Sequence, residues 1–190
     1  MSVCIISFSS RADGNCKAIG EYVRSFHDDS TMIFNFSGFN ITPCGNCHYE
    51  CFKANSQCPY SNDKVEEICN TIIGSDLTYF IMPNYNDFPC ANFFIFNERS
   101  QGYFHTHPKK QNSYENIPKK FIVVSNTNRE NFRTVFNYHV SHSVTPNILY
   151  LSAKSYHKSS IGDNILTSGE ARDDIKSFIL NRKEQSFEKE

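Results

Sequence analysis

Short apolar runs alternate along this chain with segments whose apolar residues recur at helical spacing, and this alternation restricts the fold more than any other feature. The apolar runs, rich in Val, Ile and Phe, cover residues 3–8, 32–36, 77–82, 121–125 and 148–151. None of them alternates strictly between apolar and polar residues, which is typical of strands covered on both faces. The pattern therefore predicts five parallel strands.

The segments between these runs predict helices with one apolar face. Residues 18–26, 65–73, 132–139 and 171–179 each carry apolar side chains three or four positions apart. Strands that alternate with helices are joined by right-handed crossovers, which place helices on both faces of a parallel sheet. The sequence therefore indicates an α/β fold, in which ligands bind at the carboxyl ends of the strands. The loops that follow the strands are where we look for a site.

Composition limits the partners of this chain. Its 190 residues, of which 39% are hydrophobic, suffice for one buried core, so we expect a single domain over 1–190. A formal net charge of −1 gives no general attraction to nucleic acid or to an anionic membrane. No apolar run reaches the roughly 20 residues of a membrane span. The opening residues MSVCIISFSS lack a basic leader and a cleavage site, which predicts a cytoplasmic protein with reduced thiols.

Two segments fall outside the alternating pattern. The polar stretch 100–118 contains several His and Tyr residues and is too long for a simple turn, so we expect a lid or a loop that faces a partner. The charged end of the chain, from about residue 182, is expected to be a frayed tail.

The loop after the first strand has the composition of a phosphate site. Hydroxyl groups, a cation, a glycine and the start of a helix follow one another there, contributed by Ser9, Ser10, Arg11, Gly14, Asn15 and Cys16. Backbone N–H groups at a helix start and a nearby arginine both bind phosphate oxygens. An ordinary polar turn with a solvated arginine has the same composition, so the residues alone leave both interpretations open.

A cluster of four cysteines follows the second strand. Cys44, Cys47, Cys51 and Cys58 are spaced C-x2-C-x3-C-x6-C within the segment 43–59, which we call the cysteine segment. Four thiolates ligate an iron–sulfur cluster or a zinc ion, and free thiols are the third alternative. The sheet topology predicts that this segment lies at the same edge as the phosphate loop.

Several motifs resemble a known family. Ser9, Arg11, Gly14 and Asn15 match a first loop of the form G-S-x-R-x-x-G-N, with Phe8 where that motif begins with glycine. After the third strand, Pro83-Asn84-Tyr85 matches P-x-Y, and Glu98-Arg99 stands where a helix carries Asp-Arg. Over roughly residues 1–125 the chain resembles the flavodoxin-like NAD(P)H-dependent FMN reductases and, among them, the iron–sulfur flavoproteins.

This resemblance implies a flavodoxin-like sheet of five parallel strands in the order 2-1-3-4-5. It implies FMN as cofactor, with its phosphate on the first loop and its ring lined by Pro83, Asn84, Tyr85 and Asn86, while Ser125, Asn126 and Thr127 close the site. For the four cysteines it implies a [4Fe-4S] cluster. The implied partners are NAD(P)H or a one-electron carrier protein, and the implied assembly is a homodimer or homotetramer.

A second hypothesis is that the chain is a flavodoxin-like scaffold without cofactor, which acts as a binding or interaction module. Its main support is Phe8, which replaces glycine in the phosphate loop, and Phe94, which replaces a lysine that is frequent in the family in the helix after the third strand. The cysteine segment would then hold zinc or carry free thiols. The direction of the Phe8 ring separates the two hypotheses, because a ring that fills the loop leaves no room for an anion.

Overall fold

The structure is a computed structural model that describes residues 1–45, 47–53, 57–126, 132–141 and 147–180. Thr127 and the predicted tail from about residue 182 lie outside the described residues. Within the described part, no helix is long and apolar enough to cross a membrane.

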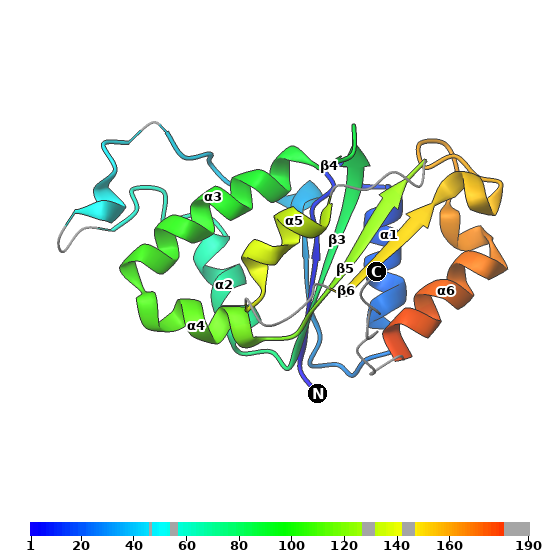
Figure 1. The fold of residues 1–190 in the computed structure, drawn as a ribbon, viewed down its shortest axis with the longest axis horizontal. Coiled ribbons are helices and arrows are strands. Elements are labelled where there is room, and N and C mark those ends of the chain that lie inside the picture. The colour runs from blue at the N-terminus through cyan, green and yellow to red at the C-terminus, as the bar shows by residue number, and fades with distance from the viewer. Residues whose placement is uncertain (46, 54–56, 127–131, 142–146, 181–190) are drawn as a thin grey trace, which may run out of the picture.

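Five parallel strands form the centre of the molecule (Figure 1). They are β1 (Val3–Ser7), β2 (Met32–Asn35), β3 (Leu77–Tyr85), β5 (Lys119–Ser125) and β6 (Asn147–Ser152), and they lie in the order β2-β1-β3-β5-β6. Both the parallel arrangement and the predicted order are confirmed. In the register, Ile5 of β1 lies between Ile33 of β2 and Tyr79 of β3.

A sixth, short strand, β4 (Phe88–Pro89), pairs antiparallel with the end of β3 and was not predicted. The two residues of the turn, Asn86 and Asp87, have φ angles of 53° and 66°. Asn and Asp tolerate this left-handed conformation, which two-residue hairpin turns require. The backbone N–H of Asp87 also donates to Asn84 Oδ1 at 2.8 Å. This hairpin extends β3 to Tyr85, beyond its predicted end at residue 82.

Helices cover both faces of the sheet (Figure 1). Side chains of α1 (Asn15–Arg24) and α6 (Gly169–Leu180) pack on one face. Those of α2 (Val65–Ile73), α3 (Ala91–Thr106), α4 (Pro108–Asn116) and α5 (Phe132–Phe136) pack on the other. Five short 3-10 helices complete the described elements, namely η1 (Phe36–Gly38), η2 (Glu50–Phe52), η3 (Asn137–His139), η4 (Ala153–Tyr156) and η5 (Ile165–Thr167).

The stretch 100–118 is not the lid or loop that its polarity predicted. It contains the last two turns of α3 and the whole of α4. His107 separates the two helices, and Pro108 occupies the first position of α4. Proline fits that position because its missing N–H would have no helical partner there. Tyr103, Phe104 and Tyr114 are buried and join both helices to the core.

The Phe8 ring points into the core. It is fully buried, and its centroid lies 5.0 Å from that of Phe36, 5.4 Å from that of Phe80 and 5.3 Å from that of Phe93. Side chains alternate along a strand, so Phe8 faces the same side as Cys4 and Ile6 of β1. The ring therefore belongs to the layer beneath α3 and does not fill the loop that follows.

Two buried lysines at the start of β5 contact helix ends on opposite faces of the sheet. Lys119 Nζ donates to the carbonyl oxygens of Tyr114 and, at 3.0 Å, Ile117, at the end of α4. Lys120 Nζ donates to the carbonyl oxygens of Phe178 and Ile179, at 2.6 and 3.1 Å, in the last turn of α6. Carbonyl groups in the last turn of a helix lack helical partners, and a cation there is favourable.

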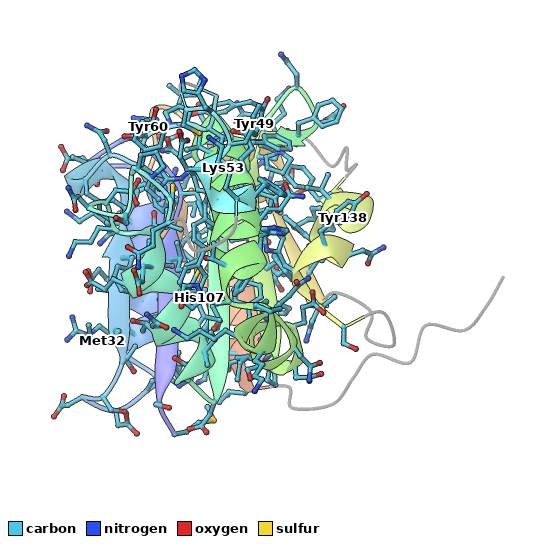
Figure 2. The ribbon with its side chains drawn as sticks, turned by 90° about the vertical axis from the view of Figure 1, so that its left-hand side faces the viewer. Met32, Tyr49, Lys53, Tyr60, His107 and Tyr138 are labelled. Atoms are coloured by element: carbon cyan, nitrogen blue, oxygen red, sulfur yellow. The ribbon has the colours of Figure 1, made fainter. Side chains whose placement is uncertain are left out.

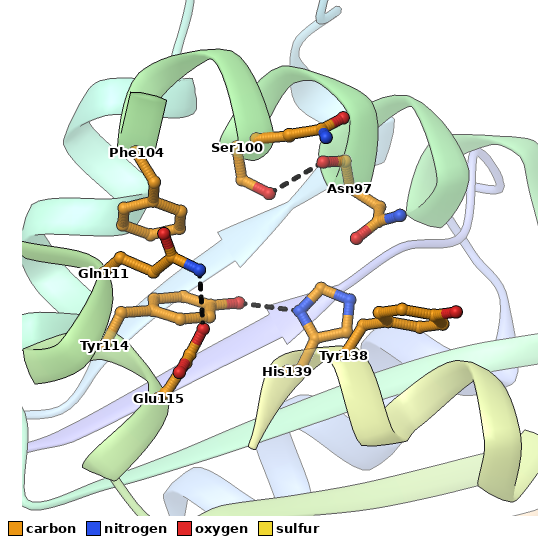
Figure 3. A pocket seen from close by; sticks show the side chains of 9 residues that line it. Asn97, Ser100, Phe104, Gln111, Tyr114, Glu115, Tyr138 and His139 are labelled. Carbon is orange, nitrogen blue, oxygen red and sulfur yellow. Dashed lines mark hydrogen bonds between the residues drawn. The ribbon is translucent and has the colours of Figure 1, made fainter. Parts of the chain in front are cut away.

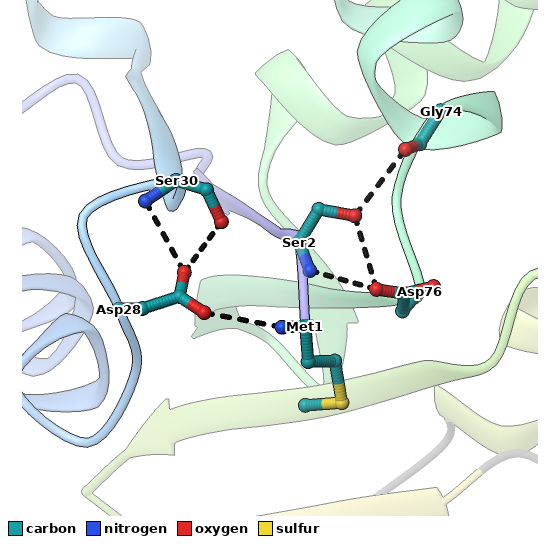
Figure 4. Close-up of polar contacts among 6 residues, drawn as sticks. All are labelled: Met1, Ser2, Asp28, Ser30, Gly74 and Asp76. Atoms are coloured by element: carbon teal, nitrogen blue, oxygen red, sulfur yellow. Dashed lines mark hydrogen bonds and ion pairs between the residues drawn. The ribbon is translucent and has the colours of Figure 1, made fainter.

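The start of β1 is joined to the segments beside it (Figure 4). The backbone N–H of Ser2 donates to Asp76 Oδ2 at 2.7 Å, and the Ser2 hydroxyl donates to the carbonyl oxygen of Gly74 at 3.3 Å. The amino group of Met1 pairs with Asp28 Oδ2 at 3.1 Å. These contacts fix β1 against the turns that precede β2 and β3.

Candidate functional site

The loop between β1 and α1 presents a series of backbone N–H groups at the carboxyl edge of the sheet. Strand pairing ends as the Phe8 N–H donates to the carbonyl oxygen of Ile81 at 2.9 Å, and α1 then begins at Asn15. Among the described residues, no acceptor is found for the N–H groups of Ala12, Asp13, Asn15 and Cys16. Free N–H groups at a helix start form a ready site for an anion.

Gly14 keeps this loop open. A Cβ atom at this position would lie 3.1 Å from Arg11 Cβ and 3.6 Å from Ser9 Oγ. The Ser9 hydroxyl accepts the N–H of Arg11 at 3.2 Å, and Arg11 Nη2 donates to the carbonyl oxygen of Ile161 at 2.9 Å. Within the described part of the chain this is the one hydrogen bond of the guanidinium group, which leaves its other nitrogens for an anion.

Asn15 joins the loop to a segment that sequence reasoning missed. Its Nδ2 donates to the carbonyl oxygens of Ser160 and Asp163, at 3.0 and 2.9 Å. Its Oδ1 accepts the N–H of Ile165 at 2.8 Å. Asn15 is 8% exposed, so these bonds are largely shielded from water. The only feature of the sequence that could have indicated this segment is the run of polar residues after the last strand.

Two further residues reach the loop from the start of α3. Asn92 Nδ2 donates to the carbonyl oxygen of Phe8 at 2.8 Å and to Ser10 Oγ at 2.9 Å. Cys90 Sγ donates to the same carbonyl oxygen at 3.3 Å. Asn92 did not emerge from the sequence, because its role depends on the β3–β4 hairpin that brings α3 to the loop.

The ends of β3 and β5 meet beside this loop, as predicted. Asn84 Nδ2 donates to Ser125 Oγ at 3.2 Å. Asn126 Oδ1 accepts the N–H of Ser160 at 2.8 Å, so the segment that holds Asn15 also holds the end of β5. Tyr85, on the hairpin, is 56% exposed. The predicted residues of three loops therefore lie at one edge, with Thr127 outside the described residues.

Cys16 differs from its neighbours in the loop. Its side chain is buried in the core on the α1 side of the sheet. Burial raises the pKa of this thiol well above its usual range, and the neighbouring Cys90 adds to the shift. The residue therefore offers an anion its backbone N–H rather than a thiolate.

The cysteine segment lies along α3 and not beside the phosphate loop. A Cβ atom on Gly102 would lie 3.5 Å from Cys51 Sγ, and the Phe52 ring is 4.2 Å from that of His105. Gly102 lies ten residues after Asn92, or about 15 Å along the helix. The predicted placement at the flavin edge is therefore wrong for Cys51. Figure 2 shows the side chains of Tyr49, Lys53 and Tyr60 at this end of the molecule.

Arg99 anchors the cysteine segment to α3. Its guanidinium donates to Asp63 Oδ2 at 2.6 Å and to the carbonyl oxygens of Thr42 and Tyr60 at 2.6 and 2.9 Å. The side chain is 3% exposed, and that of Asp63 is 11% exposed. One buried cation thus holds both ends of the segment.

The four cysteines do not form a metal site as they are placed. Among the described residues, which include all four, no three His, Cys, Asp or Glu side chains are arranged to hold a metal ion. Burial raises the pKa of Cys51, and the neighbouring thiols of Cys58 and Cys47 add to the shift.

The comparisons with known proteins bear on the fold. No family model and no curated protein matches this chain. Among solved structures, the Trp repressor binding protein of Bacillus subtilis is 13% identical, with a TM-score of 0.63 over 96% of this chain and 100% of that one. An NADH:FMN oxidoreductase in its apo form is 13% identical, with a TM-score of 0.51 over 94% and 88%. A flavoenzyme NAD(P)H:(acceptor) oxidoreductase of Paracoccus denitrificans is 13% identical, with a TM-score of 0.53 over 94% of both chains.

The fold is flavodoxin-like. In a flavodoxin-like sheet the strand order reverses at β1 and β3, and ligands bind at the carboxyl ends of those strands. The open N–H groups after β1 and the exposed Tyr85 after β3 lie at this position. The described residues that the sequence analysis assigned to a site lie at this edge of the sheet.

Proposed function

We propose that this chain is an FMN-dependent oxidoreductase that takes electrons from NAD(P)H. The observation that carries the proposal is the β1–α1 loop, where Gly14, Arg11 and N–H groups without an acceptor among the described residues supply the donors and the cation that bind a phosphate monoester. The names of two structural neighbours, an NADH:FMN oxidoreductase and an NAD(P)H:(acceptor) oxidoreductase, support the choice of cofactor and donor.

In this proposal the residues of the site bind and orient, and bound FMN supplies the redox chemistry. The N–H groups of Asn15 and Cys16 and the Arg11 guanidinium hold the phosphate. Asn84 and Ser125 fix the edge against which the ring lies, and Tyr85 offers an aromatic face for stacking. The hydrogen bonds of Asn15 hold the segment near residue 160 in place beside the phosphate.

Arg11→Ala should weaken FMN binding about 10- to 150-fold, because it removes a charge-assisted contact worth about 1.5–3 kcal/mol. Fluorescence titration of apoprotein with FMN measures the dissociation constant. Arg24→Ala is the matched control, since Arg24 lies in the last turn of α1, the helix that follows the loop, and its loss should leave the affinity unchanged.

The competing scaffold hypothesis gives the opposite result in the same experiment. A protein that is colourless when purified, takes up no added FMN and keeps its thermal midpoint when FMN is added would refute the flavin proposal. A yellow protein that releases FMN on denaturation would refute the scaffold.

We propose a homodimer or homotetramer in which the flavin edge faces a second copy. Tyr85 and Phe88 support this assembly, because they expose 56% and 51% of their surface on the β3–β4 hairpin. Burial of such side chains against a partner is favourable. Sedimentation of the purified protein gives the number of chains.

The cysteine segment carries a separate proposal, namely that Cys44, Cys47, Cys51 and Cys58 take up a [4Fe-4S] cluster and exchange electrons with a one-electron carrier. Their C-x2-C-x3-C-x6-C spacing supports it, although a change in the segment is required to bring the sulfurs together. Anaerobic reconstitution with iron and sulfide should give about four iron atoms per chain and a broad visible absorbance. The Cys69→Ser variant, altered in a core thiol, is the control. Stoichiometric zinc, or neither metal, would contradict the cluster.

A further inference from the structure

A cavity of about 330 Å³ lies between α3, α4 and η3, away from the loops of the flavin site (Figure 3). Its wall includes Asn97 and Phe104 from α3, Glu115 from α4, and Tyr138 and His139 from η3. Pockets for small molecules begin at about 300 Å³, so this one suits a compound of one or two rings. The smaller cavity beside Cys58 and Arg99, about 80 Å³, is near the size of a few waters.

A buried polar atom without a partner lines this cavity. His139 is 2% exposed, and its Nδ1 lies 2.8 Å from the hydroxyl oxygen of Tyr114. Its Nε2 is buried and finds no hydrogen-bond partner among the described residues. Figure 3 shows this second ring nitrogen turned away from Tyr114, toward the space between Asn97 and Tyr138. Buried polar atoms are nearly always hydrogen-bonded, so an orphan at a cavity wall points to a missing partner.

The protonation of His139 decides which partner fits. Burial, with a smaller contribution from the cation of Lys119, lowers the pKa of His139 to about 3, so the ring is neutral at pH 7. Within the described part of the chain, the Tyr114 hydroxyl has no other partner than Nδ1. It therefore donates to Nδ1, and the single ring proton is on Nε2. His139 Nε2 is thus a hydrogen-bond donor to a ligand in the cavity.

Glu115 and the Nε2 proton together determine which charge fits the cavity. The Glu115 carboxylate, which accepts from Gln111 Nε2 at 2.8 Å, repels an anion. A cation would be attracted by the same carboxylate, but it has no acceptor to offer and would leave the Nε2 proton unsatisfied. The aromatic side chains of Phe104 and Tyr138 supply apolar surface for a flat ring.

We propose that this cavity binds a small, uncharged, planar ring compound whose carbonyl oxygen accepts the proton of His139 Nε2. The carboxamide of Asn97, which faces the same space, is placed to contact a polar group beside that carbonyl. This site is separate from the flavin site and does not depend on FMN, so each proposal stands or fails without the other.

Three probes of one shape and different charge test the proposal. Benzamide, benzoate and benzylamine are titrated into ¹⁵N-labelled full-length protein, and backbone and histidine side-chain signals are followed by NMR. Benzamide should bind saturably, with a dissociation constant on the order of 1 mM for so small a ligand. It should shift the Nε2 signal of His139 and the amides near Ser100, Phe104 and Tyr138. Benzoate and benzylamine should bind at least tenfold more weakly.

The variant His139→Phe keeps a ring of similar size and removes the donor. It should weaken benzamide binding about tenfold and leave FMN uptake unchanged. The same exchange at His105, an exposed residue of α3 outside this wall, is the control and should change neither.

Equal binding of the three probes, or shifts that map to another part of the molecule, would overturn the proposal. So would the absence of any saturable shift, the result expected if a bound water alone satisfies Nε2. Because the wild-type Nε2 signal is a direct readout, these outcomes remain decisive even if His139→Phe fails to fold.

Discussion

Replacing Arg99 with alanine should lower the free energy of unfolding by about 3–5 kcal/mol, the usual cost of removing one partner from a buried ion pair. Asp63 would keep a carboxylate that is 11% exposed, and the carbonyl oxygens of Thr42 and Tyr60 would lose their donor. Urea denaturation measures the change. Arg24→Ala is the control, since its pair with Glu21 is exposed and 3.9 Å long, and such pairs contribute about 0–1 kcal/mol.

The same variant should release the cysteine segment from α3. Cys51 is 8% exposed in the structure, so its thiol should react slowly with a water-soluble disulfide reagent in the native protein. In Arg99→Ala the rate should rise severalfold under native conditions, whereas the core thiol of Cys69 should stay protected. An equal loss of stability in the two arginine variants, with unchanged thiol rates, would show that Arg99 does not anchor the segment.

The second large effect is a loss of stability in acid that arises from His139. Its folded pKa is about 3, whereas an unfolded histidine titrates near 6.5. Between these values the unfolded chain binds a proton that the folded chain does not, so stability falls as the pH falls from about 6.5 to about 3. At 1.36 kcal/mol per pH unit, the complete effect reaches about 5 kcal/mol.

Other groups also titrate in this range, so the measurement is a difference between two proteins. Urea denaturation of the wild type and of His139→Phe from pH 7 to pH 4 gives two curves, and the carboxylates contribute equally to both. Lys119, the charged neighbour of His139, is protonated below its folded pKa of about 7. The free energy of unfolding should fall with pH more steeply in the wild type, by the slope that corresponds to about one additional proton bound on unfolding. Parallel curves would mean that His139 titrates normally.

Much of the fold could be predicted from local patterns. The apolar runs located all five parallel strands, and the helix predicted over 65–73 has the observed bounds of α2. α4 was missed because Tyr114 is its one buried side chain, so the helix shows almost no apolar face. Its position depends on contacts of Tyr114 with Phe104 and His139, which join segments distant in the sequence.

Only part of the candidate site could be predicted from the sequence. Ser9, Arg11 and Gly14 lie in one loop, whose composition fitted both a phosphate site and an ordinary polar turn. The contacts of Asn15 span 145 to 150 residues, and no local pattern reports such a distance. The direction of Phe8 was predictable, because two-residue alternation from Cys4 and Ile6 places its ring in the core.

The two adjacent lysines of β5 make the two ends of the sheet electrostatically different. At its amino end, Lys119 and Lys120 donate to carbonyl oxygens at the ends of α4 and α6 inside the protein. At the opposite end, the first N–H groups of α1 find no acceptor among the described residues. In the proposed function, a phosphorylated ligand would therefore meet its hydrogen-bond donors at the carboxyl ends of the strands.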